Sequence, residues 1–330
     1  MRRRQSASIA AATAIAAFSF TLAPLLRFWV LPRVQLAPRD IDSTDVAVGT
    51  GTYLDPATGK ESGPARITIT RHIVGDVAES ERTGYAVWDV ATRTDTPATL
   101  AAADPRQAYS FSVARWVFDR HTNAPKACCG TDPPVVGEAY MKYPFGLGKH
   151  DYEVWDATAL HSYVAHFDGT ENVNGHLLYR FVGAVPQVRI GSISVPAGVV
   201  GLTGSDIVAA DEYYANPREV TLVDPVTGAP IEGSSHLHVT LRPPGGGTDA
   251  VVALDVDVSS DPTTIATTSQ RAARDDSRLA FVATTGPLAS LGLGTAATLT
   301  GAAVAVRERS HRRSPRPVPL PDPVERLATP

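Results

Sequence analysis

The stretch Ala65-Arg66-Ile67-Thr68-Ile69-Thr70-Arg71 alternates apolar and polar side chains from one residue to the next. Since successive side chains of a β-strand point to opposite faces, this period of two predicts a half-buried strand. Similar segments, rich in β-branched and aromatic residues, recur at 109–118, 177–182, 219–223, 236–241 and 251–258. The middle of the chain is therefore predicted to be mainly β.

Turn motifs separate these segments. The pattern Asp-Pro-x-Thr-Gly occurs at 55–59 and again at 224–228, and residues 119–123 form a looser copy, Asp-Arg-His-Thr-Asn. Proline sets the first turn residue, Asp and Thr bond the local backbone, and Gly or Asn accepts the left-handed conformation. An Asp-rich loop can instead hold calcium, but the ligand spacing of a calcium loop is missing. We therefore expect hairpins and an antiparallel β-sandwich or barrel-like domain.

Two long runs without a charged residue, 5–26 and 279–306, flank this β region. Each is long enough to cross a hydrocarbon core of about 30 Å as a helix. For the first run the alternative is a cleaved signal peptide, but Arg27-Phe28-Trp29 stands where a small-x-small cleavage site would follow. For the second, the alternative is a flexible Ala/Gly linker. The runs predict transmembrane helices at 7–31 and 279–306.

Small residues recur every four positions in the second run, which predicts a helical face that a neighbouring helix approaches closely. The first run has a similar face with Ser8, Ala12 and Ala16. The predicted helix-packing positions of the second run are Gly286, Ser290, Gly294 and Thr298, followed by Ala302.

Arginine clusters lie beyond the outer ends of both runs, so the positive-inside rule places both termini in the cytoplasm. We expect a two-pass plasma-membrane protein whose main domain is extracytoplasmic. The expected order is a cytoplasmic N-terminus (1–6), the first span (7–31), a β-rich extracytoplasmic domain (32–260), a helical stalk (261–278), the second span (279–306) and a disordered cytoplasmic tail (307–330).

Composition narrows the function. The chain has 330 residues, 43% hydrophobic and 19% charged, with a net charge of −4, which argues against a nucleic-acid partner. No His-Glu-x-x-His, nucleophile elbow, phosphate loop or dinucleotide fingerprint is present. We therefore expect neither an enzyme nor a cofactor.

Cys128 and Cys129 are the only two cysteines of the chain and are adjacent. Outside the cytoplasm, conditions favour disulfides. A structural disulfide between the two, a pair of free thiols, and a redox or metal role all remain open, and we favour the disulfide.

His236 and His238 face the same side of a predicted strand, but the sequence identifies no third metal ligand, so ordinary exposed histidines are the preferred interpretation.

The most distinctive segment, 143–156, combines an aromatic-Pro-Phe turn, a lysine and an aromatic strand. It is a candidate surface or ligand segment, although a buried aromatic corner is the preferred alternative because such rings dominate β-protein cores. The candidate residues are Tyr143, Pro144, Phe145, Lys149, Tyr152 and Trp155.

Three stretches of the sequence carry a resemblance to a known family. Residues 118–122 with Cys128-Cys129, residues 143–156, and 168–181 with its Asp-Gly-Thr-Glu start resemble an actinobacterial family of unknown function, the porin PorA-like family. The resemblance extends over nearly the whole chain, up to about Val306. It implies an envelope protein anchored by two helices, and it assigns no catalytic residue.

Two functions from different classes follow as expectations. The first is a membrane-anchored extracytoplasmic binding module, whose ligand is a lipid or another amphiphile of the envelope. The alternative is a porin-like pore or a transporter-associated protein, and a scaffold for envelope proteins is a third option. The predicted strands carry charge and histidine, unlike the lipid-facing strands of a membrane barrel, so a pore would need oligomerised helices. Expected partners are membrane lipids and either a second copy of the chain or an envelope protein.

Overall fold

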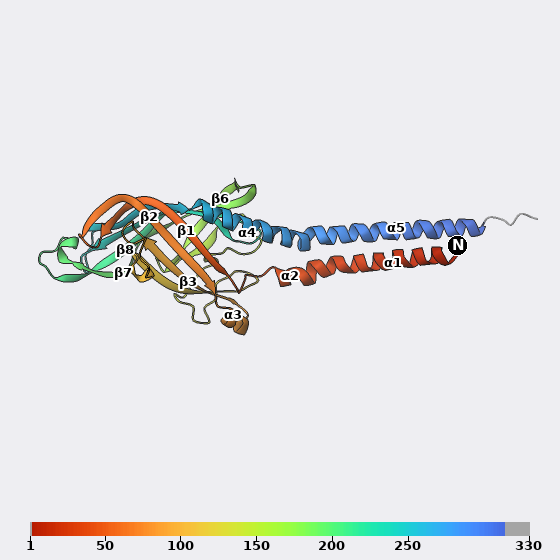
Figure 1. Ribbon diagram of the computed structural model, residues 1–330, viewed down its shortest axis with the longest axis horizontal. Helices are drawn as coiled ribbons and strands as arrows, with labels where there is room; N and C mark the ends of the chain where they lie inside the picture. The colour runs from red at the N-terminus through yellow and green to blue at the C-terminus, as the bar shows by residue number, and fades with distance from the viewer. Residues whose placement is uncertain (1, 314–330) are drawn as a thin grey trace, which may run out of the picture. The chain divides into compact units, whose positions relative to one another are not determined.

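A computed structural model describes residues 2–313 of the chain (Figure 1). The chain forms two compact units. Among the described residues, one unit is helical and contains 2–33 and 279–313; the other, Val34–Arg278, contains all the described strands. The part of the expected tail at 314–330 lies outside the described residues.

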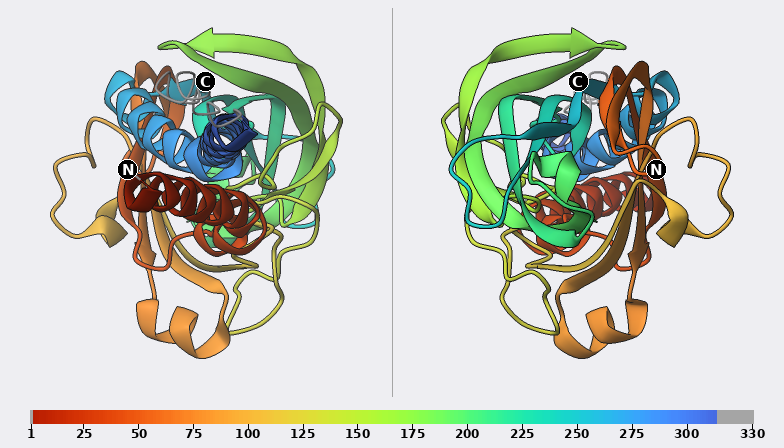
Figure 2. Two further views of the ribbon diagram at one scale, coloured as in Figure 1. Left: turned by 90° about the vertical axis from the view of Figure 1, so that its right-hand side faces the viewer. Right: turned by 90° about the vertical axis from the view of Figure 1, so that its left-hand side faces the viewer.

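The β unit is one antiparallel sheet of ten strands, in the order β4-β3-β2-β1-β10-β9-β8-β7-β6-β5. The prediction of a mainly antiparallel β domain is confirmed, and because all strands share a single curled sheet, the barrel-like alternative applies (Figure 2). The strands are β1 (Asp42–Asp55), β2 (Lys60–Gly75), β3 (Ala86–Asp95), β4 (Ser110–Phe118), β5 (Tyr152–Asp156), β6 (His161–Val173), β7 (His176–Pro196), β8 (Ile207–Val223), β9 (Pro230–Arg242) and β10 (Val251–Ser260).

Four short or peripheral helices complete the unit: α3 (Val77–Thr83), the 3-10 turns η2 (Pro105–Gln107) and η3 (Ala197–Val200), and α4 (Pro262–Ala280). The α4 helix covers the segment expected as a stalk, and it packs on the sheet. Its Ala272 lies in one buried cluster with Leu178, Leu222 and Ile231, which come from three consecutive strands.

The alternating stretch at 65–71 lies in β2, where its apolar side chains face the core. Ile67 is fully buried and packs with Leu254 and Val256 of β10. The intervening strand β1 passes very close to β10: a Cβ on Gly51 would lie 2.1 Å from the carbonyl oxygen of Asp255. Only glycine permits this approach, which lets the sheet curl tightly at its centre.

A long connection, residues 119–151, joins the two edge strands β4 and β5. Arg115 of β4 exchanges backbone hydrogen bonds with Asp132 (2.8 and 3.1 Å), and the connection also pairs with β5 through Ala139 and Val154. Trp116 of β4 and Trp155 of β5 lie in one buried cluster with Tyr140 of the connection. The connection thus covers part of each sheet edge, which would otherwise present unpaired backbone groups.

The helical unit contains two long helical segments. The first is α1 (Arg2–Pro24) followed by the π-turn η1 (Leu25–Val30) and α2 (Leu31–Val34); the second is the π-turn η4 (Phe281–Thr285) followed by α5 (Gly286–Arg313). Among the described residues, two helical stretches contain a window long and apolar enough to cross a membrane, Ala7–Val34 and Pro262–Arg307, and the mean hydropathies of these windows are 1.9 and 1.5.

The second helix continues past the expected end of the span. Residues 307–313 belong to α5, so the expectation of disorder from 307 onward is wrong for these seven positions. The reason is that the charged segment after Val306 contains no helix breaker, and the next proline in the sequence is Pro315.

Candidate functional site

Small side chains form the interface between α1 and α5. Ala16, Ser19 and Ala23 of α1 are buried, as are Ser290 and Gly294 of α5. A Cβ on Gly294 would lie 3.2 Å from the Cβ of Ser19 and 3.3 Å from the ring of Phe20. The two backbones therefore approach closely, as in membrane helix pairs that associate through small residues.

The predicted four-residue stripe does not follow this interface to its end. Gly286, Ser290 and Gly294 are buried, whereas Thr298 is exposed and the contact continues at Ala297 and Gly301. A Cβ on Gly301 would lie 3.3 Å from that of Ala12. A step of four residues turns an α-helix by about 400°, so a stripe at that spacing drifts by about 40° per step and leaves the packing face after three steps.

Large apolar side chains cover the outside of the helical unit. They include Phe18, Phe28, Leu288, Leu293 and Leu299, with exposed fractions of 57 to 77%. The threonine hydroxyls among them are satisfied locally: Thr295 and Thr298 each donate a hydrogen bond of 2.8 Å to the carbonyl oxygen four residues earlier. A surface of this kind suits a hydrocarbon environment.

Two arginines lie near the junction with the β unit. Arg27 donates a long hydrogen bond of 3.5 Å to the carbonyl oxygen of Ala283 on the other helix. Arg33 lies over the ring of Trp29 at 4.1 Å and donates to its carbonyl oxygen at 2.6 Å. Arginine and tryptophan in this arrangement are typical of a membrane interface.

Comparison with known proteins decides the family. A family model described as "Porin PorA" matches residues 10–303, a range that includes most of both long helices and all ten strands. The chain belongs to the porin PorA family. It is also similar to "Porin PorA" of Corynebacterium amycolatum, with 24% identity, and the match covers 68% of this chain and 75% of that protein.

In this PorA-family chain, the conspicuous aromatic segment contributes to the core. Tyr143, Tyr152 and Trp155 have exposed fractions of 4, 5 and 7%. Tyr143 stacks on Phe181 of β7 with ring centroids 4.9 Å apart. Lys149 is exposed, and its ammonium lies 5.4 Å from the centroid of the Tyr179 ring.

Residues Pro144 and Phe145 of the same segment are only partly buried. The ammonium of Lys142 lies 5.3 Å from the centroid of the Phe145 ring. The segment as a whole thus forms a corner whose rings point inward, and only its edge reaches the surface.

Cys128 and Cys129 form a disulfide with each other, and neither is a free thiol. The following turn is held by Thr131, whose hydroxyl donates to the carbonyl oxygens of Lys126 (2.9 Å) and Cys128 (2.6 Å). The bridge therefore belongs to the connection that covers the sheet edges, which is a structural position.

Strand β8 also holds a polar group. The Glu219 carboxylate accepts hydrogen bonds from Asn216 (2.7 Å) and Ser235. Burial raises the pKa of the Glu219 carboxyl, while these hydrogen bonds oppose the rise.

A second polar feature is a cleft of about 190 Å³ between β1 and α4, lined by Asp42, Ser43, Thr44, Asp45, Thr264, Thr267, Thr268 and Arg271.

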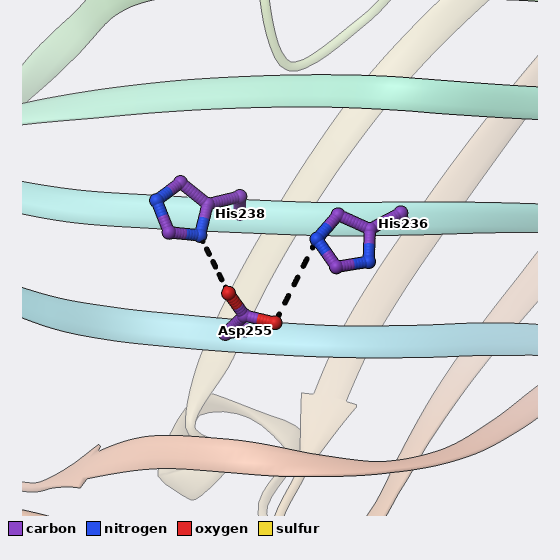
Figure 3. Close-up of side chains that lie close together, drawn as sticks. All are labelled: His236, His238 and Asp255. Atoms are coloured by element: carbon purple, nitrogen blue, oxygen red, sulfur yellow. Dashed lines mark hydrogen bonds and ion pairs between the residues drawn. The ribbon is translucent and has the colours of Figure 1, made fainter.

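The two histidines noted in the sequence acquire a third neighbour in the sheet. His236 and His238 of β9 lie beside Asp255 of β10 (Figure 3). One possible metal-ligand atom from each of the three residues lies within 4.8 Å of the other two. Sequence reasoning missed Asp255 because it is 17 positions from His238. The available signal was the alternation Leu254-Asp255-Val256-Asp257, which places two carboxylates on one strand face.

Proposed function

We propose that this protein forms pores in a membrane, and that several copies of the helix pair build the pore wall. Membership of the porin PorA family is the observation that carries the proposal. The helix pair supports it because its outer surface is apolar and its two backbones are held together by small residues.

The helices are better candidates for the membrane part than the sheet. The face of β9 and β10 that points away from the core carries His236, His238, Asp255 and Asp257, which is not a lipid-facing composition. The concave side is occupied by buried clusters that contain Tyr143, Tyr152 and Phe181. We therefore place the conducting path in an assembly of helices.

One flank of α5 has the composition expected of a pore lining. Thr295 and Thr298 are exposed on a side of α5 that does not contact α1. Their hydroxyl oxygens keep lone pairs that can accept hydrogen bonds from water, although the protons are donated to the helix backbone. No Asp, Glu, Lys or Arg occurs between Leu279 and Val306, so we expect weak selectivity between cations and anions.

We further propose a two-pass plasma-membrane topology with both termini in the cytoplasm and the β unit outside, on the basis of the arginine clusters at 2–4 and 307–313. Membrane lipids would contact the exposed Phe and Leu side chains. The binding module for an amphiphile ranks below the pore, because family membership supports the pore and the described cleft beside α4, at about 190 Å³, is smaller than the roughly 300 to 1,000 Å³ of typical ligand pockets.

Single-channel recording tests the pore. Purified full-length protein is reconstituted into planar bilayers, and step-like currents are expected. The double variant T295V/T298V removes two hydroxyls at nearly constant volume and should lower the unit conductance severalfold. The matched control is T300V, since Thr300 is also exposed and also bonded to the carbonyl oxygen four residues earlier, but lies on the other flank of α5.

The outcomes separate two claims. If the pure protein gives no steps, the pore function is wrong. If steps occur and the double variant behaves like T300V, the protein is a pore but α5 does not line it.

A further inference from the structure

We propose that His236, His238 and Asp255 bind one first-row transition-metal ion, of which Zn²⁺ is the most suitable, on the face of the sheet that points away from the core. Imidazole nitrogens and a carboxylate oxygen are a common ligand set for zinc, which takes three protein ligands and a water in open sites.

The strand register creates the cluster. His238 pairs directly with Asp255, and His236 pairs with Asp257, across β9 and β10. Directly paired residues of antiparallel strands share a face. The intervening residues Leu237, Leu254 and Val256 pack in the core, so the four polar side chains project from the opposite face.

The distances suit a tetrahedral ion. His238 Nδ1 lies 2.8 Å from one carboxylate oxygen of Asp255, and His236 Nε2 lies 3.7 Å from the other (Figure 3). Two ligand atoms bound at 2.0 to 2.1 Å in a tetrahedral site are about 3.3 Å apart. The two observed separations lie on either side of that value, but they end on different oxygens of Asp255. With one ligand atom from each residue, the three atoms lie within 4.8 Å of one another, so side-chain rotations are needed to bring them around one ion.

Asp257 supplies the support that metal-bound histidines usually have. Its Oδ1 lies 3.1 Å from Nδ1 of His236, which leaves Nε2 of the same ring directed toward Asp255. A carboxylate that accepts the other ring N–H fixes the tautomer and orientation of a metal ligand. Arg218 also pairs with Oδ1 of Asp257, at 2.5 Å, and so helps to fix this carboxylate.

The site is both accessible and well supported. The histidine side chains are 28 and 29% exposed, so an ion and a water ligand can reach them. The cross-strand neighbour of His238 on β8 is Ala215, whose small side chain leaves room beside the ring. On the other side, β1 closes on the backbone of both aspartates through Gly49 and Gly51, which limits their movement.

Two other His–Asp pairs lack this arrangement. His72 pairs with Asp42 at 3.0 Å, and His166 pairs with Asp151 at 2.8 Å, each with a single histidine. Neither belongs to a described group of three possible ligands, whereas His236, His238 and Asp255 do. These pairs therefore serve as internal controls.

The test is a zinc titration of the full-length protein without a polyhistidine tag, in detergent, after removal of metal with a chelator. Isothermal titration calorimetry of the wild type should give one Zn²⁺ per chain. H238A and D255N should weaken binding at least about tenfold, and D257N should weaken it about 10- to 100-fold by releasing His236. H72A should bind like the wild type.

A second readout guards against misfolding of a variant. Co²⁺ in place of Zn²⁺ should give the intense visible absorption of a tetrahedral complex in the wild type and in H72A, and H238Q should lose it while keeping the wild-type near-ultraviolet circular dichroism. The proposal is overturned if the wild type binds no stoichiometric metal, or if H238A and D255N bind as tightly as H72A.

Discussion

At the scale of single residues, Asn123 connects three loops. It is fully buried and has a left-handed backbone, with φ of 62°. Its side-chain NH₂ donates to the carbonyl oxygens of Tyr143 (2.8 Å) and Thr227 (3.2 Å). Two copies of the turn motif seen in the sequence, at 119–123 and 224–228, are thereby joined to the aromatic corner.

We expect N123A to lower the free energy of unfolding by about 3 kcal/mol, because two buried carbonyl groups lose their donor and alanine resists a positive φ. N123G tolerates the backbone conformation and should lose less. Urea unfolding of the full chain in detergent, followed by near-ultraviolet circular dichroism, measures both. The control H121A lies in the same turn at an exposed position and should change stability by less than about 0.5 kcal/mol. Equal losses for H121A and N123A would contradict this role.

At the scale of elements, the close contact between β1 and β10 determines how the sheet curls. The carbonyl oxygen of Asp255 occupies the space where a side chain at Gly51 would begin, and that of Asp257 does the same at Gly49, 2.0 Å from the position of a Cβ. Any side chain at these positions must push the central strands apart.

The variant G51A should therefore lose about 3 kcal/mol or more of stability. Gly191 of β7 is the matched control, since a Cβ there meets no atom within 4 Å. G191A should stay within about 1 kcal/mol of the wild type. Thermal unfolding of the full chain compares the pair. A G51A protein as stable as G191A would show that the sheet can open at this contact without cost.

At the scale of the whole molecule, the chain consists of two units with different surfaces. Among the large apolar side chains described in the helical unit, Phe28 is 77% exposed and Leu288 is 67% exposed. The β unit has its own buried clusters, and its sheet edges are partly covered. A unit with its own core meets the main requirement for independent folding.

Residues 34–278 alone should therefore fold as a soluble domain when produced in an oxidising compartment. Size-exclusion chromatography should show a monomer, and circular dichroism should show β structure. Native mass spectrometry of the same sample should show the bare protein, with the mass of a Cys128–Cys129 disulfide. An aggregated product would refute the independence of the unit, and a bound lipid mass would restore the binding module to first place.

Much of the architecture follows from the sequence, because local patterns determine it. Alternation at 65–71 and in the later segments predicts strands, since strand side chains alternate between faces whatever the partner strand. Uncharged runs of sufficient length at both ends predict the two long helices. The glycines and serine at 286, 290 and 294 predict the first part of the helix contact, because one face of a helix is visible in its spacing.

Only the tertiary structure decided the rest. The choice between a sandwich and one curled sheet depends on how β4 and β5 meet through residues 119–151, which have no periodic pattern. The exchange of Thr298 for Ala297 and Gly301 depends on which face of α5 lies against α1. Asp255 joins His236 and His238 only through the register of β9 and β10. The physical reason is common to all three: side chains distant in sequence become neighbours only when backbone hydrogen bonds and packing set the pairing.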